Sequence, residues 1–173
     1  MDRREEKAPA PEFPGRPPGL AALIHRGGVY TIPGGTSPAA FLRELTQRLI
    51  LPAGLAAGPL LRAVLEREEL MPTAIGQGIA LPHPRTPLLE SPEDQFVTVA
   101  FAERPVDWNS LDGIPVHTAL LIVSASARLH LRTLSEINFF CRQESFRALL
   151  SRRPPEEDIL RAVSEAEASW SGA

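Results

Sequence analysis

The chain has 173 residues, of which 43% are hydrophobic, and a formal net charge of −3 at pH 7. This length and composition are typical of one globular domain. The negative net charge does not provide the positive surface potential that nucleic-acid binding requires. A single cysteine, Cys141, excludes an internal disulfide framework and a cysteine-rich zinc site. No apolar run reaches the roughly 18 residues that span a bilayer, and the charged N-terminus lacks the apolar core of a secretory signal, so we expect a cytoplasmic protein without membrane insertion.

Residues 1–18 form a segment of low hydrophobicity at the start of the chain. They include five prolines and eight charges of mixed sign. Such a segment cannot bury enough apolar surface to offset the conformational entropy that ordering costs. The sequence therefore predicts a flexible N-terminal tail over residues 1–18, followed by one domain over residues 19–173.

Apolar periodicity after the tail predicts strands and helices in alternation. Strands are expected over 29–32, 95–102 and 116–124, with a turn-rich connection or hairpin loop between the last two. Helices are expected from Pro38 behind a Ser37 cap, from Gly58 through Glu69, over 127–142, after a Ser145 cap, and from Pro155 onward. This pattern predicts an α/β fold: a single domain with a mixed, mostly parallel β-sheet flanked by helices on both faces.

The four histidines are the candidates for chemistry, because the chain has no nucleophile elbow, Walker phosphate loop, dinucleotide fingerprint or HExxH zinc motif. His25 stands in "LIHRGG" and is expected at a helix end, where it can pair with free backbone carbonyls. His117 alternates with core positions of a strand, which favours a hydrogen-bonded sheet residue over a functional one. His83 and His130 have stronger local arguments.

His83 lies between two prolines, Pro82 and Pro84, shortly after a turn formed by Gly76 and Gly78. Proline restricts the backbone on both sides of the histidine, and the glycines permit conformations that are closed to other residues. The segment is either a rigid mount for a nucleophilic imidazole or a proline-rich loop in which the histidine is incidental. An ordinary imidazole pKa of about 6.5 would leave a lone pair free at neutral pH.

His130 is expected in the first turn of the 127–142 helix. It is in register with Leu134, Ile137 and Cys141, which turns its side chain toward the body of the protein. One interpretation is a half-buried histidine that completes the apolar stripe. The other is a site residue, because the junction between a strand and the following helix is where α/β sheets place their sites.

The stretch "LEREELMPTAIGQGIALPHPRT" resembles the enzyme IIA domains of the bacterial phosphoenolpyruvate-dependent phosphotransferase system, in the fructose/mannitol class that includes the nitrogen-regulatory members. The matching positions are Arg67-Glu68, Thr73, Gly76, Gly78, Ile79, Ala80, Pro82 and His83. Two further blocks, "LDGIPVHTALLIV" and "HLRTLSEI", resemble the family's strand entry and its second-histidine helix. The resemblance covers about residues 20–163 and implies a IIA domain of type 2.

In this family the histidine of the Pro-His motif accepts a phosphoryl group from the histidine-containing phosphocarrier protein and passes it to a IIB domain, or holds it as a signal. The resemblance implies that His83 is the phosphoacceptor, that His130 lies beside it and assists, and that Arg67 lines the same pocket. It implies neither a metal nor a cofactor, because donor and acceptor are both histidines.

The resemblance also implies that the phosphate pocket is supported by Thr73, Gly76 and Gly78. Pro84 departs from the small residue that many members have after the active histidine, and it has no backbone N–H to offer a phosphate. Arg85 either compensates for that missing donor or is simply solvated.

Two other functions are considered beside the phosphocarrier. One is a free-standing regulatory protein of the nitrogen-regulatory kind, in which phosphorylation of His83 switches binding to a target protein. The other is a metal-dependent hydrolase that uses His83, His130 and a carboxylate such as Asp107 or Asp112, although no ligand spacing supports it. The sequence leaves the downstream sugar and the oligomeric state open.

Overall fold

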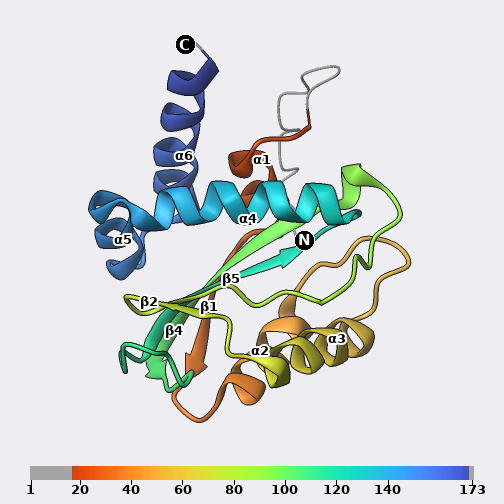
Figure 1. Cartoon of the computed structure of the whole chain (residues 1–173), viewed down its shortest axis with the longest axis vertical. Helices are drawn as coiled ribbons and strands as arrows, with labels where there is room; N and C mark the ends of the chain where they lie inside the picture. The colour runs from red at the N-terminus through yellow and green to blue at the C-terminus, as the bar shows by residue number, and fades with distance from the viewer. Residues whose placement is uncertain (1–16, 172–173) are drawn as a thin grey trace, which may run out of the picture.

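Five strands form the central sheet of the computed structural model, which describes residues 17–171 (Figure 1). The strands are β1 Val29–Gly34, β2 Ala74–Gly76, β3 Ile79–Ala80, β4 Phe96–Val106 and β5 Val116–Val123, and their order in the sheet is β1-β4-β5-β3-β2. The helices are α1 Leu20–Gly27, α2 Pro38–Arg48, α3 Ala57–Leu70, α4 Ala127–Arg142, α5 Glu144–Ser151 and α6 Glu156–Ser171, with a 3-10 turn η1 over Pro92–Asp94.

The sheet is mixed, and the α/β class is confirmed. The pairs β1/β4 and β3/β5 are parallel, and β4/β5 and β2/β3 are antiparallel. Parallel and antiparallel pairs are thus equal in number, whereas the sequence predicted a mostly parallel sheet. Two antiparallel pairs make the difference: β4 and β5 pair directly across the turn-rich connection between them, and β2 and β3, strands of three and two residues, are too short to show an alternating pattern in the sequence.

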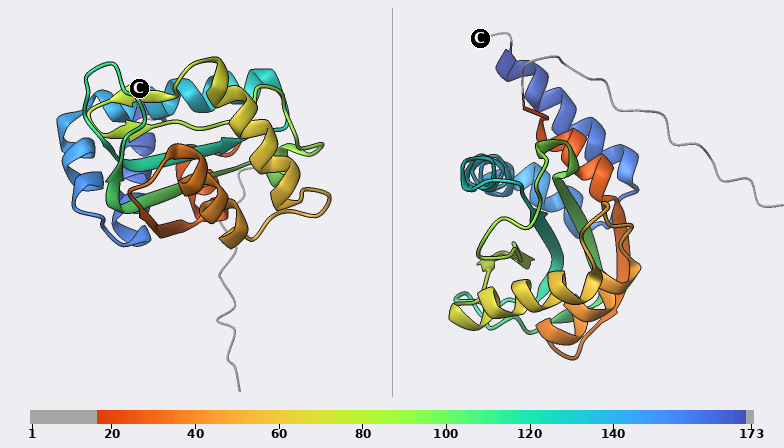
Figure 2. Two further views of the ribbon diagram at one scale, coloured as in Figure 1. Left: turned by 90° about the horizontal axis from the view of Figure 1, so that it is seen from below. Right: turned by 90° about the vertical axis from the view of Figure 1, so that its right-hand side faces the viewer.

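Helices cover both faces of this sheet, as predicted (Figure 2). One hydrophobic core lies under α1, α4, α5 and α6, and the other lies under α2 and α3. Strand β5 contributes to both cores because successive side chains point to opposite faces: Leu120 and Ile122 belong to the first, Ala119 and Leu121 to the second. The site described below is formed where the chain continues beyond the end of β3, next to β5.

Local signals placed most helix ends correctly. Ser37 caps α2 by accepting a hydrogen bond from Ala40 N at 3.1 Å, and α4 has the predicted bounds. The predicted Ser145 cap is wrong. Gln143 is extended and serves as both the end of α4 and the cap of α5, so α5 begins at Glu144 and Ser145 lies inside its first turn.

Most of the predicted tail, residues 1–16, lies outside the described residues, so the tail stays a prediction there. Pro17 and Pro18 precede α1 without regular structure. Among residues 17–171, no helix has the length and apolar character needed to cross a membrane.

Candidate functional site

The backbone on either side of the Pro-His-Pro segment is tied to neighbouring strands. Leu81 N donates to Thr73 O at 3.0 Å, and Ile122 N donates to Pro82 O at 3.0 Å. Pro82 and Pro84 are both buried, while His83 between them is half-buried. The segment is therefore held in place by the β2 side and by β5, as a rigid mount would be.

The hydrogen bond made by the His83 ring determines which of its nitrogens is free. Nδ1 lies 2.7 Å from the carbonyl oxygen of Leu81. A carbonyl oxygen can only accept, so Nδ1 carries the proton and donates it. In the neutral ring the lone pair is then on Nε2, which is the nitrogen available as a nucleophile.

His130 comes from a different part of the chain and meets His83 at this site. The two ring centroids are 4.7 Å apart and the ring planes are inclined by 45°. His130 lies in the first turn of α4, which Ser126 caps by accepting from Leu129 N at 3.2 Å. The predicted register is confirmed, because Ile137 and Cys141 on the same stripe are buried and His130 is half-buried.

Both imidazoles are neutral at pH 7. Burial lowers the pKa of His83 below its ordinary value of 6.5, and the Arg67 charge adds to this, while the Leu81 hydrogen bond and the Glu68 carboxylate oppose it. Burial, His83 and Arg67 together lower the pKa of His130 to about 4. A neutral His83 keeps the Nε2 lone pair, and a neutral His130 keeps one N–H as a donor.

The shifted pKa of His130 predicts a loss of stability in acid. The unfolded histidine takes up its proton near pH 6.5 and the folded one only near pH 4, so between these values the unfolded state binds more protons and stability falls as pH falls. We expect His130→Gln to flatten the fall in unfolding free energy between pH 6.5 and about 4, measured by urea denaturation. Equal slopes in the two proteins would contradict this assignment.

Arg67 lies near the end of α3 and acts electrostatically on both histidines. Its side chain is half-buried, and Nη1 donates to Met71 O at 3.0 Å. This hydrogen bond fixes one nitrogen of the guanidinium group to the backbone carbonyl that follows α3. A guanidinium has five N–H donors, so donors remain for an anion near the imidazoles.

Glu68 joins three parts of the structure around the site. Its Oε1 accepts from Thr73 N at 2.7 Å and from Trp108 Nε1 at 2.8 Å, and its Oε2 accepts from Thr73 Oγ1 at 2.6 Å. Thr73 and Trp108 are buried. The carboxylate therefore fixes the end of α3, and with it Arg67, relative to the hairpin that leads to His83.

We expect Glu68→Gln to lower the unfolding free energy by about 2 kcal/mol, because the neutral amide loses the charge assistance of all three hydrogen bonds, and the buried Thr73 hydroxyl, which would then accept from the NH₂ group, loses the acceptor for its own proton. The matched control is Glu69→Gln, since Glu69 is the exposed next residue of the same helix and should change stability by less than about 0.5 kcal/mol. Urea denaturation followed by tryptophan fluorescence measures both, and equal effects of the two variants would argue against a special role for Glu68.

The glycines of the motif shape the β2–β3 turn. Gly76 and Gly78 have φ values of 89° and 75°, in the region that favours glycine. A Cβ on Gly78 would lie 2.4 Å from His117 Cδ2, and one on Gly76 would lie 2.9 Å from Asp112 Oδ2. The two glycines therefore allow the hairpin to pack closely against His117 and Asp112. Thr73 contributes to the site through its two hydrogen bonds to Glu68.

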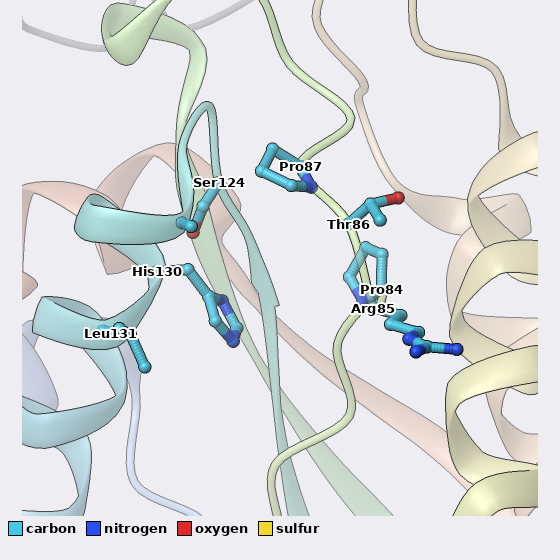
Figure 3. A pocket seen from close by; sticks show the side chains of 8 residues that line it. Pro84, Arg85, Thr86, Pro87, Ser124, His130 and Leu131 are labelled. Carbon is cyan, nitrogen blue, oxygen red and sulfur yellow. The ribbon is translucent and has the colours of Figure 1, made fainter.

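Arg85 lines a cavity of about 240 Å³ beside His130. The other residues that line it are Pro84, Thr86, Pro87, Ser124, Ala127 and Leu131. In Figure 3 the His130 ring points toward the Pro84–Pro87 segment, whereas the exposed Arg85 side chain extends away from it. Of the two paired histidines, the cavity is lined by His130.

The other histidines and the acidic residues lie in structural contacts. His25 Nδ1 is 3.0 Å from Glu156 Oε1, and His117 Nδ1 is 2.7 Å from Thr118 Oγ1. Asp112 accepts from Gln77 N, Ser110 Oγ and Ile114 N. Between residues 17 and 171, no three His, Cys, Asp or Glu side chains are grouped as metal ligands would be, so the hydrolase hypothesis has no ligand set in this part of the chain.

Sequence reasoning did not find the part that Glu68 plays. In the sequence Glu68 appears only as the neighbour of Arg67 in the Arg67-Glu68 pair, and the resemblance implies a role for the arginine alone. Trp108 and the carbonyl of Leu81 were missed as well. No local signal marks them, because their importance comes from which strands and loops the fold brings together.

Structural comparisons establish the class of fold, which is that of phosphotransferase-system IIA domains. The nitrogen regulatory protein IIA-Ntr of Neisseria meningitidis matches with a TM-score of 0.68 at 23% identity, over 78% of this chain and 92% of that chain. A putative PTS IIA domain of Streptococcus pyogenes M1 GAS matches with a TM-score of 0.64 at 16% identity, over 85% of this chain and 94% of that chain.

Sequence comparisons then establish the family. The family described as "Phosphoenolpyruvate-dependent sugar phosphotransferase system, EIIA 2" matches residues 35–166, and this chain belongs to it. The nitrogen regulatory protein of Bradyrhizobium diazoefficiens is 32% identical over 132 residues, which are 75% of this chain and 78% of that protein. The fructose-specific EIIABC component of Bacillus subtilis is 32% identical over 105 residues, 60% of this chain but only 16% of that protein.

The resemblance read from the sequence is thereby confirmed at the level of the family. EIIA domains are phosphotransfer proteins, so the activity of this chain belongs to that broad class.

Proposed function

We propose that this chain is a phosphocarrier in which His83 Nε2 accepts a phosphoryl group from the histidine-containing phosphocarrier protein. The observation that carries the proposal is the hydrogen bond between His83 Nδ1 and Leu81 O at 2.7 Å, because it leaves Nε2 as the free nucleophile next to His130 and Arg67. The His83 side chain is half-buried, so part of it is accessible to a protein donor.

The transfer needs no co-reactant. The Nε2 lone pair forms a bond to phosphorus while the phosphorus–nitrogen bond of the donor phosphohistidine breaks, and its electron pair returns to the donor nitrogen. Nothing is oxidised or reduced. The exchange between two histidines is nearly balanced, so the group can pass onward to a IIB domain in the same way.

The neighbouring side chains can stabilise the transition state. Charge gathers on the three equatorial oxygens of the transferring phosphoryl group, where fixed donors and positive charge lower the barrier. Arg67 supplies the positive charge and a planar donor fork. His130, neutral at pH 7 because its pKa is about 4, supplies an N–H donor without adding a second charge.

A regulatory role is the second candidate. A specific observation favours it: the chain aligns with 78% of the nitrogen regulatory protein of Bradyrhizobium diazoefficiens at 32% identity. A phosphoryl group on His83 would add close to two negative charges beside Arg67 and the cavity at Pro84–Pro87, and could thereby switch binding of a target protein.

The experiment incubates the chain with phosphoenolpyruvate, enzyme I and the phosphocarrier protein, and then adds a IIB domain. Uptake of one phosphoryl group per chain is expected, and its loss to the IIB domain would identify a carrier in sugar uptake. Uptake without onward transfer, together with a partner captured by only one of the two phosphorylation states, would identify the regulatory role. No uptake would overturn both.

A further inference from the structure

A second cavity, separate from the histidine pair, lies between the β2–β3 hairpin and the helices α4 and α5. Its volume is about 330 Å³, within the size range of small-molecule sites. It is lined by Ile75, Gln77, Asn138, Cys141, Arg142 and Arg147. His130 and Cys141 are eleven residues apart on α4, which is about 16 Å along the helix axis, so the two cavities lie toward opposite ends of that helix.

The charges around this cavity are positive. Two arginines line it and no aspartate or glutamate does. Residues 141–153 carry four arginines and one glutamate, a net charge of +3 in a chain whose total is −3. This local excess attracts anions even though the protein as a whole is acidic.

The two arginines have no carboxylate partner among the described residues, in contrast to Arg48 and Arg132, which form ion pairs with glutamates. Arg147 Nη1 donates to the carbonyl oxygens of Cys141 and Arg142, at 2.9 and 2.7 Å. These bonds hold the guanidinium at the end of α4. Its Nη2 and Nε groups keep their three N–H donors, so a donor fork is already positioned at the cavity.

The remaining lining residues suit the uncharged part of a small ligand. Asn138 uses its Nδ2 in a bond to Leu134 O at 2.9 Å, which leaves its Oδ1 to accept from a hydroxyl group. Ile75 is 43% exposed and offers an apolar contact. Gln77 has a φ of 56°, an uncommon conformation for a residue other than glycine, and its N–H is held by Asp112 Oδ2 at 2.7 Å.

We infer that this cavity is a binding site for a small organic oxyanion, whose phosphate or carboxylate group is held by Arg142 and Arg147. Both arginines line the same cavity, and guanidinium groups bind phosphate and carboxylate through paired, charge-assisted hydrogen bonds. The volume of about 330 Å³ suits an anion of metabolite size. The inference stands on the cavity alone and does not depend on the proposed phosphoryl transfer at His83.

The test is a titration of the full chain, followed by ¹H–¹⁵N NMR, with two probes: inorganic phosphate and citrate. We expect saturable shifts of the amides of Gln77, Asn138 and Arg142, with a dissociation constant on the order of 1 mM or tighter for at least one probe. Stronger binding of phosphate or of citrate distinguishes a phosphorylated from a carboxylated ligand.

The variants make the test specific. Arg142→Gln is expected to weaken binding at least tenfold, and since Arg142 is exposed and makes no side-chain hydrogen bond among the described residues, it should leave the fold intact. Arg43→Gln, at an exposed position on α2, should leave binding unchanged. The inference is overturned by the absence of saturable shifts at these amides, by equal binding in Arg142→Gln, or by shifts confined to the surroundings of His83 and His130.

Discussion

Replacing His83 by asparagine is expected to abolish phosphoryl uptake while leaving the fold intact. The asparagine Nδ2 lies where the histidine Nδ1 does and can keep the hydrogen bond to Leu81 O, which is 2.7 Å long in the native chain. The variant lacks Nε2, the nitrogen that we propose as the nucleophile. Uptake from the phosphorylated carrier protein, measured with labelled phosphoenolpyruvate, should fall to background.

The matched control is His25→Asn on α1. The Nδ1 of His25 also makes a hydrogen bond, to Glu156 Oε1 at 3.0 Å. Both substitutions therefore replace an imidazole whose Nδ1 is hydrogen-bonded and remove its Nε2. His25→Asn should take up as much label as the native chain. If His83→Asn still took up one phosphoryl group, the acceptor would have to be another residue.

Arg67→Ala should slow phosphoryl transfer by a factor of about 10² to 10³, the usual effect of removing one donor that stabilises transition-state charge. Arg67→Lys should give an intermediate rate, because lysine keeps the charge but loses the planar fork. The rate of label uptake under single-turnover conditions measures this directly. The loss of the Arg67–Met71 hydrogen bond should cost little stability, since it is an exposed contact.

Arg62→Ala is the control for Arg67. Arg62 is an exposed residue of the same helix, and five positions turn it about 140° away from Arg67, so its removal should leave the rate within about twofold. If both variants slowed transfer equally, the effect would reflect the general charge of α3. If neither variant slowed transfer, Arg67 would not stabilise the transition state.

The pairing of His83 with His130 shows what the sequence could predict about the site. The restricted backbone at Pro-His-Pro and the apolar register of the 127–142 helix each follow from local rules, and the structure confirms both. That the two rings meet at 4.7 Å depends on β3 running beside β5, which no local pattern states. The expectation that His130 lies beside His83 came from the family resemblance, and the distance between the two rings agrees with it.

The parts that sequence reasoning missed depend on contacts between loops. Glu68 is one charged residue among several at the end of α3, and only the folded chain shows that its carboxylate accepts from Thr73 and Trp108. The sequence identifies Pro84 as a position without an N–H donor, and in the fold Pro84 is also buried and lines the cavity beside His130. Its ring thus forms part of the wall next to the proposed phosphoacceptor.

The most direct test of the central claim is to phosphorylate the chain, with ¹⁵N in its histidines, and to locate the phosphorus–nitrogen bond by ³¹P and ¹⁵N NMR. The hydrogen bond from His83 Nδ1 to Leu81 O predicts a phosphoryl group on Nε2 of His83 and an Nδ1 that still carries its proton. A phosphoryl group on Nδ1 of His83, or on His130, would contradict the account.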